Sequence, residues 1–412
     1  MAEGFIAMVN DKALVSGFGP IEMVVLQGTS YCNLNCSYCY LSEESRRHSA
    51  TMTLETIQRA FEEVTSSPFT GSRLRVSWHS GEPLVLKPDY YRAAIETVLN
   101  VRDGSPRPDL VIDFDFQTNA TLINAAWIEF FKEYEGLVTL GVSCDGPAEL
   151  HDRHRKNWSG RSSHAATERG MQALSEAGIP FDVTAVISPD GLDEPELFLA
   201  YFEPFVPFIR EFHFNLHDEL FIDTRDRAGA SSYVMRYKAF LSRLLDLIAS
   251  GNYKTPKIRN FASFYNRLFV PAAERPSYDA RSMSAPFKTV SIEMNGDLTT
   301  FYAGLTLDEC GDQKNLYGDG RGLVIGNILE SSLSEMAGSE KLKLMMHDFE
   351  TSHSACESSC DYFDVCSGGY NLIKLRRHGT FGATETPECL VHVKAFADAV
   401  LEHMSGSLQA AG

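Results

Sequence analysis

Three cysteines within one short segment constrain this chain more than any other feature. Cys32, Cys36 and Cys39 have the spacing C-x3-C-x2-C and directly follow the apolar run 21–27. Three thiolates on one loop can hold three irons of a [4Fe–4S] cube and leave the fourth iron open to a small molecule. The alternative is a structural zinc loop, which needs a fourth ligand nearby. His48 is the nearest candidate, in a segment that we expect to be a solvent-facing loop.

Four further cysteines form a second group near the other end of the chain: Cys356, Cys360, Cys366 and Cys389. Four thiolates can complete a tetrahedral zinc site or ligate a [4Fe–4S] cluster fully. Two such groups in one chain indicate metal sites and not disulfides. Cys144 is predicted to be a packed thiol. Cys310 is predicted to be a free thiol, with a ligand or sulfur-handling role as the alternative.

Composition limits the classes of protein that this chain can belong to. It has 412 residues, is 44% hydrophobic and carries a formal charge of −18, which suits two or three globular domains. Nucleic-acid binding needs a basic surface, so we expect no nucleic-acid partner. No apolar run approaches the ~20 residues that span a bilayer, and residues 1–20 lack the pattern of a signal peptide. The sequence therefore predicts a cytoplasmic protein without a membrane partner.

The first 220 residues alternate strand-like and helix-like patterns. The predicted strands are 21–27, 74–78, 110–117, 137–142, 181–187 and 211–216, and the predicted helices are 53–66, 89–100, 125–134, 164–177 and 195–202. This alternation predicts an α/β fold with a parallel sheet. About six units fit, which favours a partial (β/α)6 open barrel with its chemistry at the carboxyl ends of the strands.

Three domains are predicted from changes in pattern. Residues 1–220 form the barrel, 221–285 a helical bridge, and 286–412 a small domain. The small domain begins with a β-hairpin around Asn295-Gly296 and ends with a helix at about 391–404.

The first cysteine motif, with Tyr38 before its last cysteine, resembles the signature of the radical S-adenosylmethionine (SAM) superfamily. In that family the open iron chelates the amine and carboxylate of SAM. The reduced cluster passes one electron to the sulfonium, and a 5′-deoxyadenosyl radical abstracts a substrate hydrogen. The resemblance also implies a flavodoxin- or ferredoxin-type electron donor.

Further motifs at strand ends match the family's SAM contacts. The resemblance places the SAM-binding residues at Tyr38, Gly81, Glu82, Pro83, Asn119, Ser143, Asp145 and Arg155. The segment Gly81-Glu82-Pro83 would receive the amino group, and Arg155 would bind the carboxylate. Asp145 would hold the ribose or a substrate, with turn formation as its alternative.

The C-terminal cysteines resemble the distal half of a SPASM (or twitch-like) auxiliary-cluster domain. The resemblance implies an auxiliary [4Fe–4S] cluster on Cys356, Cys360, Cys366 and Cys389, with a zinc ribbon as the alternative. Two departures stand out: Phe301 lies where the domain's first cysteine is expected, and Tyr370 replaces a later one. We therefore expect two [4Fe–4S] clusters in all, of which one is auxiliary.

Motifs at 212–215, 326–333 and 379–389 resemble peptide maturases that act on glycine-rich repeats or form cyclophanes, and more distantly the anaerobic sulfatase-maturing enzymes. This implies an oxidoreductase of natural-product biosynthesis that crosslinks a ribosomal precursor peptide. The alternative is radical modification of a nucleoside, sugar or amino acid, including sulfur insertion. The altered element Tyr302-Ala303-Gly304 and the lack of an obvious leader-binding domain favour this alternative.

A base for substrate deprotonation must lie within hydrogen-bond reach of the proton it takes. Tyr302, His217 and Asp218 are the candidates, and Glu219, Asp223 and Asp361 are further polar residues that the sequence does not separate from them. Two rival classes fit poorly. A non-catalytic scaffold would have degenerate SAM motifs. A zinc hydrolase would need His213 and His217 together, but four residues along a strand span about 13 Å.

Overall fold

One curved sheet organises the molecule. The structure, a computed structural model, describes residues 17–217, 227–271, 274, 285–301 and 313–411. Within them lies a nine-stranded sheet in the order β6-β5-β4-β3-β2-β1-β7-β8-β9. Its strands are β1 (Ile21–Leu26), β2 (Thr70–Trp78), β3 (Val111–Thr118), β4 (Val138–Ser143), β5 (Phe181–Ile187), β6 (Ile209–Leu216), β7 (Thr289–Ile292), β8 (Asp297–Thr300) and β9 (Gly326–Asn327).

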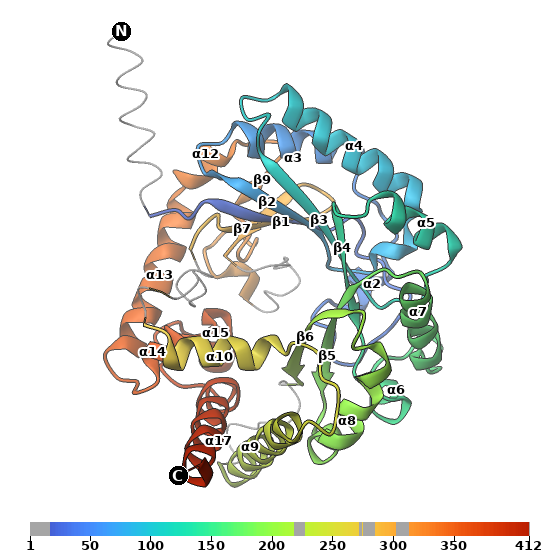
Figure 1. The fold of residues 1–412 in the computed structure, drawn as a ribbon. Coiled ribbons are helices and arrows are strands. Elements are labelled where there is room, and N and C mark those ends of the chain that lie inside the picture. Colours follow the sequence, from blue (N-terminus) through green and yellow to red (C-terminus); the bar gives the residue numbers. More distant parts are fainter. Residues whose placement is uncertain (1–16, 218–226, 272–273, 275–284, 302–312, 412) are drawn as a thin grey trace.

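Strands β1 to β6 are parallel neighbours, and helices cover the outer face of the sheet they form (Figure 1). The main covering helices are α3 (Leu54–Ser66), α4 (Pro88–Gly104), α5 (Ala125–Glu133), α7 (His164–Glu176) and α8 (Pro195–Phe202). The two edge strands, β6 and β9, do not pair with each other. The predicted open (β/α)6 barrel is therefore confirmed.

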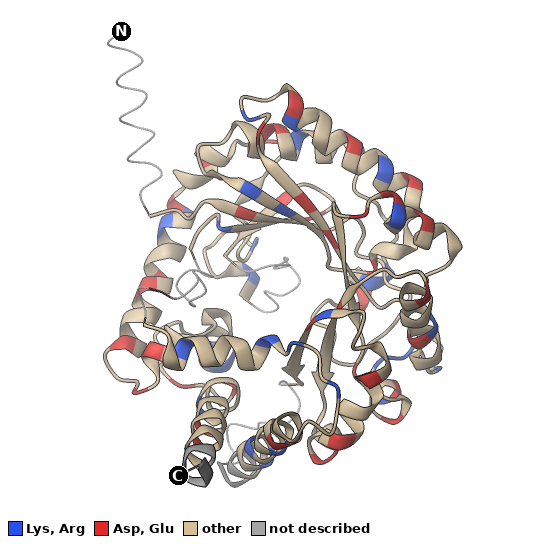
Figure 2. Cartoon of the chain, viewed as in Figure 1, with Lys and Arg blue, Asp and Glu red and all other residues tan. Residues whose placement is uncertain are grey.

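Alternation along the strands separates a core from an inner face. On β3, Ile112, Phe114 and Phe116 are buried while the residues between them are only partly buried. Phe116 packs beneath the outer helices, with ring centroids 4.7 Å from Tyr91 and 6.2 Å from Trp127. Polar residues thus line the concave face, as period-two alternation requires. Figure 2 shows acidic and basic residues mixed along the outer helices and on some strands.

The predicted hairpin is present and continues the barrel sheet. Strands β7 and β8 are antiparallel around the Asn295-Gly296 turn. Strand β7 also pairs in parallel with β1, with Val25 opposite Ser291. One sheet therefore crosses the boundary that the sequence places at residue 286, and the domain limits stay a prediction.

Further helices come after β6 in the chain: α9 (Arg227–Ser250), α10 (Arg259–Phe269), α12 (Leu333–Ala337), α13 (Glu340–Glu357), α14 (Phe363–Cys366), α15 (Asn371–His378), α16 (Pro387–Cys389), the π-helical turn η6 (Leu390–Ala395) and α17 (Phe396–Ala411). Helices α9 and α10 connect β6 to β7, and the other helices follow β9; α10, α13 and α14 lie on the open side of the sheet (Figure 1). Phe264 of α10 stacks on Phe396 of α17 at 4.1 Å. This contact fixes the C-terminal helix against the segment that follows the barrel.

The segment before His48 is largely solvent-facing, as expected, but it is a helix and not a loop. Residues Glu43–Arg47 form the short helix α2, and the side chain of Ser42 caps it. Arg46 is buried because its Nε donates to the carbonyl of Leu41 and its NH1 donates to Asn35. A buried arginine that satisfies backbone and amide oxygens orders a segment that composition alone marks as loop. His48 ends the helix and is exposed.

In the part of the chain that the structure describes, no helix is both long and apolar enough to cross a membrane.

Candidate active site at the strand ends and the auxiliary cysteine cavity

The first three cysteines lie on a loop fixed by two neighbouring segments. The N–H of Cys32 donates to the carbonyl of Arg46 at 3.0 Å, and the indole of Trp158 donates to the carbonyl of Cys32 at 2.8 Å. The N–H of Ser37 donates to the carbonyl of His154 at 3.0 Å. All three cysteines are partly buried, and none of them forms a disulfide with another described cysteine. Backbone bonds on both sides of the motif therefore hold it at the carboxyl end of β1.

Burial makes the thiols of Cys32 and Cys36 reluctant to ionise in the absence of metal. It raises the pKa of Cys36 to about 11, with the negative charges of Cys39 and Asp145 as smaller contributions. The pKa of Cys32 is raised further, first by burial and then by the charge of Glu82. Because cluster ligands are thiolates, metal binding here must release protons. Once ionised, the thiolates repel one another, and bound metal cations would offset that repulsion.

Gly81 lets the second SAM-motif segment approach the cysteine loop. Its φ is +139°, and a Cβ there would lie 2.2 Å from the carbonyl oxygen of Thr29. The N–H of Glu82 donates to the carbonyl of Tyr31 at 2.9 Å, next to Cys32. Only glycine fits this conformation and this contact. The motif therefore lies against the cysteine loop at the end of β2.

Glu82 is the buried acid of this region, with 1% of its surface exposed. Its Oε1 accepts from Thr118 Oγ1 at 2.6 Å and from the N–H of Leu84 at 3.0 Å, and its Oε2 accepts from the N–H of Asn119 at 2.8 Å. Burial nevertheless raises its pKa to about 7. Among the described residues, no lysine, arginine or histidine forms an ion pair with it. An ammonium group placed here would supply the missing positive charge.

Pro83 and Asn119 are fixed by their neighbours. Pro83 begins the short 3-10 helix η1 (Pro83–Val85), and its carbonyl accepts from the hydroxyl of Tyr91. Asn119 donates through Nδ2 to Asn33 Oδ1 at 2.9 Å, which ties the end of β3 to the cysteine loop. Asn33 also donates to Thr121 at 2.8 Å. Nothing in the sequence singles out Asn33 beyond its place inside the cysteine motif.

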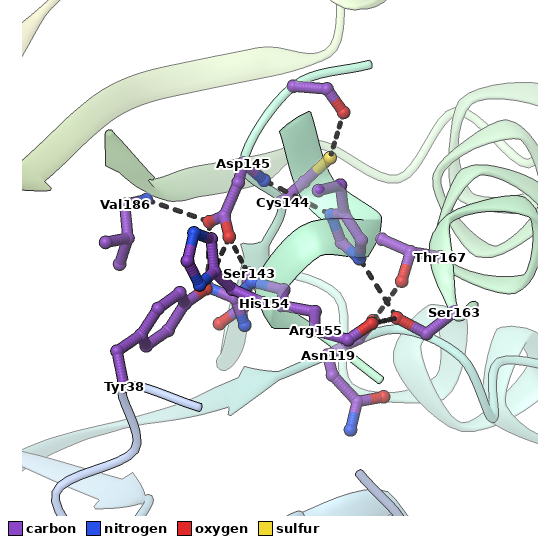
Figure 3. A network of polar contacts seen from close by, with 12 residues as sticks. Tyr38, Asn119, Ser143, Cys144, Asp145, His154, Arg155, Ser163, Thr167 and Val186 are labelled. Carbon is purple, nitrogen blue, oxygen red and sulfur yellow. Dashed lines mark hydrogen bonds and ion pairs between the residues drawn. The ribbon is translucent and has the colours of Figure 1, made fainter. Parts of the chain in front are cut away.

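Asp145 is the centre of the polar network in Figure 3. Its Oδ2 accepts from the hydroxyl of Tyr38 and from Arg155 Nε at 2.9 Å, and its Oδ1 accepts from Arg155 NH2 at 3.1 Å and from the N–H of Val186 at 2.8 Å. Burial opposes ionisation, but Arg155 and His151 outweigh it, and the pKa of Asp145 is lowered. The carboxylate thus joins the cysteine loop, β4 and β5.

This network leaves Asp145 and Arg155 little freedom to bind SAM as the sequence predicts. Arg155 is 8% exposed at its side chain and commits two of its nitrogens to Asp145. Ser143 Oγ accepts from Gln117 at 2.9 Å on the same inner face. The SAM contacts of these residues stay predictions, and the geometry gives the Asp145–Arg155 pair a positioning role.

His217 lies beside the cysteine loop. It is buried at the end of β6, with its ring centroid 5.2 Å from that of Tyr38 and 4.9 Å from that of His154. It is therefore the one candidate base of the three whose place is visible. Asp218 and Tyr302 lie outside the described residues, as do Glu219, Asp223 and Cys310.

The second cysteine group lines a cavity of about 450 Å³ between the C-terminal helices and β6. Cys356 is near the end of α13, Cys366 ends α14 and Cys389 ends α16. Burial raises the pKa of Cys389 to about 12 and also raises that of Cys366. His213 and Asn215 from β6 line the same cavity. One space therefore connects the four thiols with the inner face of the barrel.

Two residues near this cavity occupy positions where a full SPASM domain would have cysteines, and a third contacts one of the cysteines present. Tyr370 lines the cavity in place of a cysteine. Phe301 is buried and packs 4.5 Å from the ring of Phe349, so its position is apolar. Lys374, which no sequence motif includes, has its ammonium nitrogen 3.0 Å from Cys356 Sγ. A lysine inside an amphipathic helix gives no sequence signal for such a contact.

No three histidine, cysteine, aspartate or glutamate side chains in the described ranges form a ready-made site for a single metal ion. Assignment of both cysteine groups to iron–sulfur clusters therefore depends on spacing, on the shared cavity and on family. Cys144 is fully buried in the apolar core, which confirms the predicted packed thiol.

Comparison with known proteins defines the class. A family model described as the radical SAM superfamily matches residues 26–201. The uncharacterized protein sll1766 of Synechocystis is 33% identical over 395 residues, 96% of this chain and 94% of that protein. The serine-type anaerobic sulfatase-maturating enzyme of Bacteroides thetaiotaomicron is 32% identical over 188 residues, 45% of this chain and 44% of that enzyme.

Solved structures share the fold. Native anSMEcpe with bound AdoMet and Cp18Cys peptide superposes with a TM-score of 0.72 at 19% identity, covering 95% of this chain and 100% of that chain. Streptococcus suis SuiB bound to precursor peptide SuiA gives a TM-score of 0.59 at 17% identity, covering 90% and 76%.

The chain belongs to the radical SAM superfamily and is an enzyme related to the sulfatase maturases. The predicted use of SAM and of iron–sulfur chemistry is thereby confirmed. The residues that hold each group stay predictions.

Proposed function

We propose that this enzyme abstracts hydrogen from an unactivated carbon of a ribosomal precursor peptide and forms a crosslink there. The observation that carries the proposal is the cavity shared by the four C-terminal cysteines and by His213 and Asn215 of β6. A substrate that enters from the barrel interior can reach the C-terminal site without leaving the protein.

On the barrel side, Cys32, Cys36 and Cys39 would hold the SAM-binding cluster. Glu82 would accept the SAM ammonium, for which its buried and cation-free carboxylate is suited. When bound, these groups supply the 5′-deoxyadenosyl radical that takes the substrate hydrogen. The Asp145–Arg155 pair holds Tyr38 and with it the loop that carries the three cysteines.

On the C-terminal side, Cys356, Cys360, Cys366 and Cys389 would hold one fully ligated auxiliary cluster. Bond formation after hydrogen abstraction leaves one electron in excess, and such a cluster supplies an electron acceptor. Full ligation by four cysteines supports this role over sulfur donation, which needs an open position.

Loss of a proton from the substrate also requires a base, and His213 joins His217 as a candidate. Burial lowers the pKa of His213 to about 4, so the imidazole is neutral and can accept a proton. Its Nε2 lies 3.0 Å from Asn215 Oδ1, and its Nδ1 has no hydrogen-bond partner among the described residues. Its place at the wall of the shared cavity, and not its basicity, supports this role, because a general base works best with a pKa near the operating pH.

A peptide substrate is further supported by the two structural neighbours, which were solved with peptides bound. The experiment combines reconstituted, dithionite-reduced enzyme, SAM and a short peptide encoded next to its gene. We expect 5′-deoxyadenosine and a peptide lighter by two hydrogen atoms, with deuterium passing from a labelled β-carbon to 5′-deoxyadenosine. The Cys32→Ala, Cys36→Ala, Cys39→Ala triple variant is the control. Modification of a nucleoside, sugar or amino acid with the peptide left unchanged would contradict the proposal.

A further inference from the structure

Lys374 has a fully satisfied ammonium group in the interior of the C-terminal domain. Only 4% of the residue is exposed. Its Nζ donates to Ser352 Oγ at 2.8 Å, to the carbonyl of Ser352 at 3.1 Å and to Cys356 Sγ at 3.0 Å. A lysine has three N–H donors, so these three acceptors use all of them. The side chain is therefore directed at the sulfur by its complete hydrogen-bond set.

This buried cation contacts no carboxylate in the described residues. Glu388, which lines the same cavity, instead accepts from Arg377 Nε at 2.6 Å. Buried charges are costly unless an opposite charge is close. Of the four cysteines proposed as cluster ligands, Cys356 is the one whose sulfur contacts the ammonium of Lys374 in the described residues.

The surroundings hold Lys374 in this place. Ser352, which accepts from it, donates to Asn371 Oδ1 at 2.9 Å, and both residues are fully buried. His353 Nδ1 lies 2.8 Å from the carbonyl oxygen of Ser367, one residue after Cys366. Gly368 leaves room for that ring, because a Cβ there would lie 2.3 Å from Nδ1. The network spans α13, α15 and the turn after α14, and it surrounds two of the four cysteines.

We propose that Lys374 sets the reduction potential of the auxiliary [4Fe–4S] cluster, as a positioning residue that acts through Cys356. The inference depends on the ligand assignment under the proposed function. Net charge and hydrogen bonds to the ligand sulfurs set the potentials of such clusters. Reduction adds negative charge to a group already held by four thiolates, so an adjacent ammonium stabilises the reduced form more. Lys374 thus raises the potential and makes the group a better electron acceptor.

The test is an anaerobic redox titration of the full-length holoenzyme followed by EPR. Added SAM perturbs the spectrum of the open-iron cluster and so separates the two signals. In Lys374→Met we expect the equilibrium constant for reduction of the auxiliary cluster to fall at least about tenfold. This corresponds to a reduction potential lower by about 59 mV for one electron. Lys374→Arg keeps the positive charge and should therefore have a reduction potential close to that of the unaltered enzyme. Lys343→Met, on the exposed face of α13, is the control and should leave the potential unchanged.

Each outcome decides the proposal. An unchanged auxiliary potential in Lys374→Met at full iron content would overturn it. If Lys374→Met loses iron, Lys374→Gln decides, because it keeps a donor without the charge; a wild-type potential in that variant would also overturn it. Wild-type enzyme with only about four irons would instead show that the ligand assignment itself is wrong.

Discussion

The two cysteine regions differ in which charge the protein leaves unpaired. On the barrel side, the buried carboxylate of Glu82 has no cation partner among the described residues, whereas Asp145 and Arg155 pair with each other. Near the C-terminal cysteines, the buried ammonium of Lys374 has no carboxylate partner within the ranges that the structure describes. The first region is built to receive a cation and the second to receive an anion. This difference suits the ammonium of SAM on one side and a thiolate-ligated cluster on the other.

Replacing the three barrel cysteines should have the largest effect, because it removes one proposed cluster and leaves the other in place. The Cys32→Ala, Cys36→Ala, Cys39→Ala variant should lose 5′-deoxyadenosine formation to background and keep about four of about eight irons. Chromatography of the nucleoside and iron analysis measure the two effects. Retained SAM cleavage would refute the assignment of this loop. Eight remaining irons would reveal a second auxiliary site and refute our interpretation of Phe301 and Tyr370.

Asp145→Asn should destabilise the barrel side by about 3 kcal/mol, because it leaves Arg155 as a buried charge without its partner. Chemical denaturation of the metal-free protein measures this. Asp190→Asn removes an exposed ion pair with Arg153 and should cost only about 0–1 kcal/mol. If both variants lose equally little unfolding free energy, the positioning role is wrong and the ligand contact that the sequence predicts for Asp145 is favoured.

Glu82→Gln tests the carboxylate that has no cation partner. A charged hydrogen bond is worth about 1.5–3 kcal/mol, so SAM affinity of the cluster-loaded enzyme should fall about 10- to 100-fold by anaerobic calorimetry. Glu96→Gln, exposed on α4, is the matched control.

The same carboxylate should make SAM binding depend on pH. Burial raises its pKa to about 7 in the free protein, so below pH 7 the group is protonated and must lose that proton to pair with an ammonium. The Kd should therefore rise as pH falls below 7, by up to about tenfold per unit, and level off above it. Glu82→Gln should lose this dependence. A pH-independent Kd in the unaltered enzyme would argue against contact between Glu82 and the ammonium.

The strands and helices of the barrel could be predicted because each depends mainly on the hydrophobic pattern and the capping residues of its own segment. The ranges 181–187 and 195–202 match β5 and α8, and Thr53 caps α3 as its side chain implies. The contacts that shape the sites depend on pairs distant in sequence. Asp145 meets Tyr38 across 107 positions, and β7 joins β1 across the predicted domain boundary. No spacing or periodicity records such partners, so the sequence yields the candidate ligand cysteines but not the charged residues around them.

His48→Ala should have the smallest effect, and it sharpens the distinction between iron and zinc. A zinc loop would need His48 as a fourth ligand beside Cys32, Cys36 and Cys39. The residue instead ends α2 on the exposed surface, where its backbone N–H donates to the carbonyl of Ser45. We therefore expect unchanged iron content and unchanged 5′-deoxyadenosine formation in this variant, while Cys39→Ala on the same loop should lose about half of the iron and all of the 5′-deoxyadenosine formation. Zinc that binds the unaltered protein and is lost in His48→Ala would support the zinc alternative, since an open-iron cluster has no use for a fourth protein ligand.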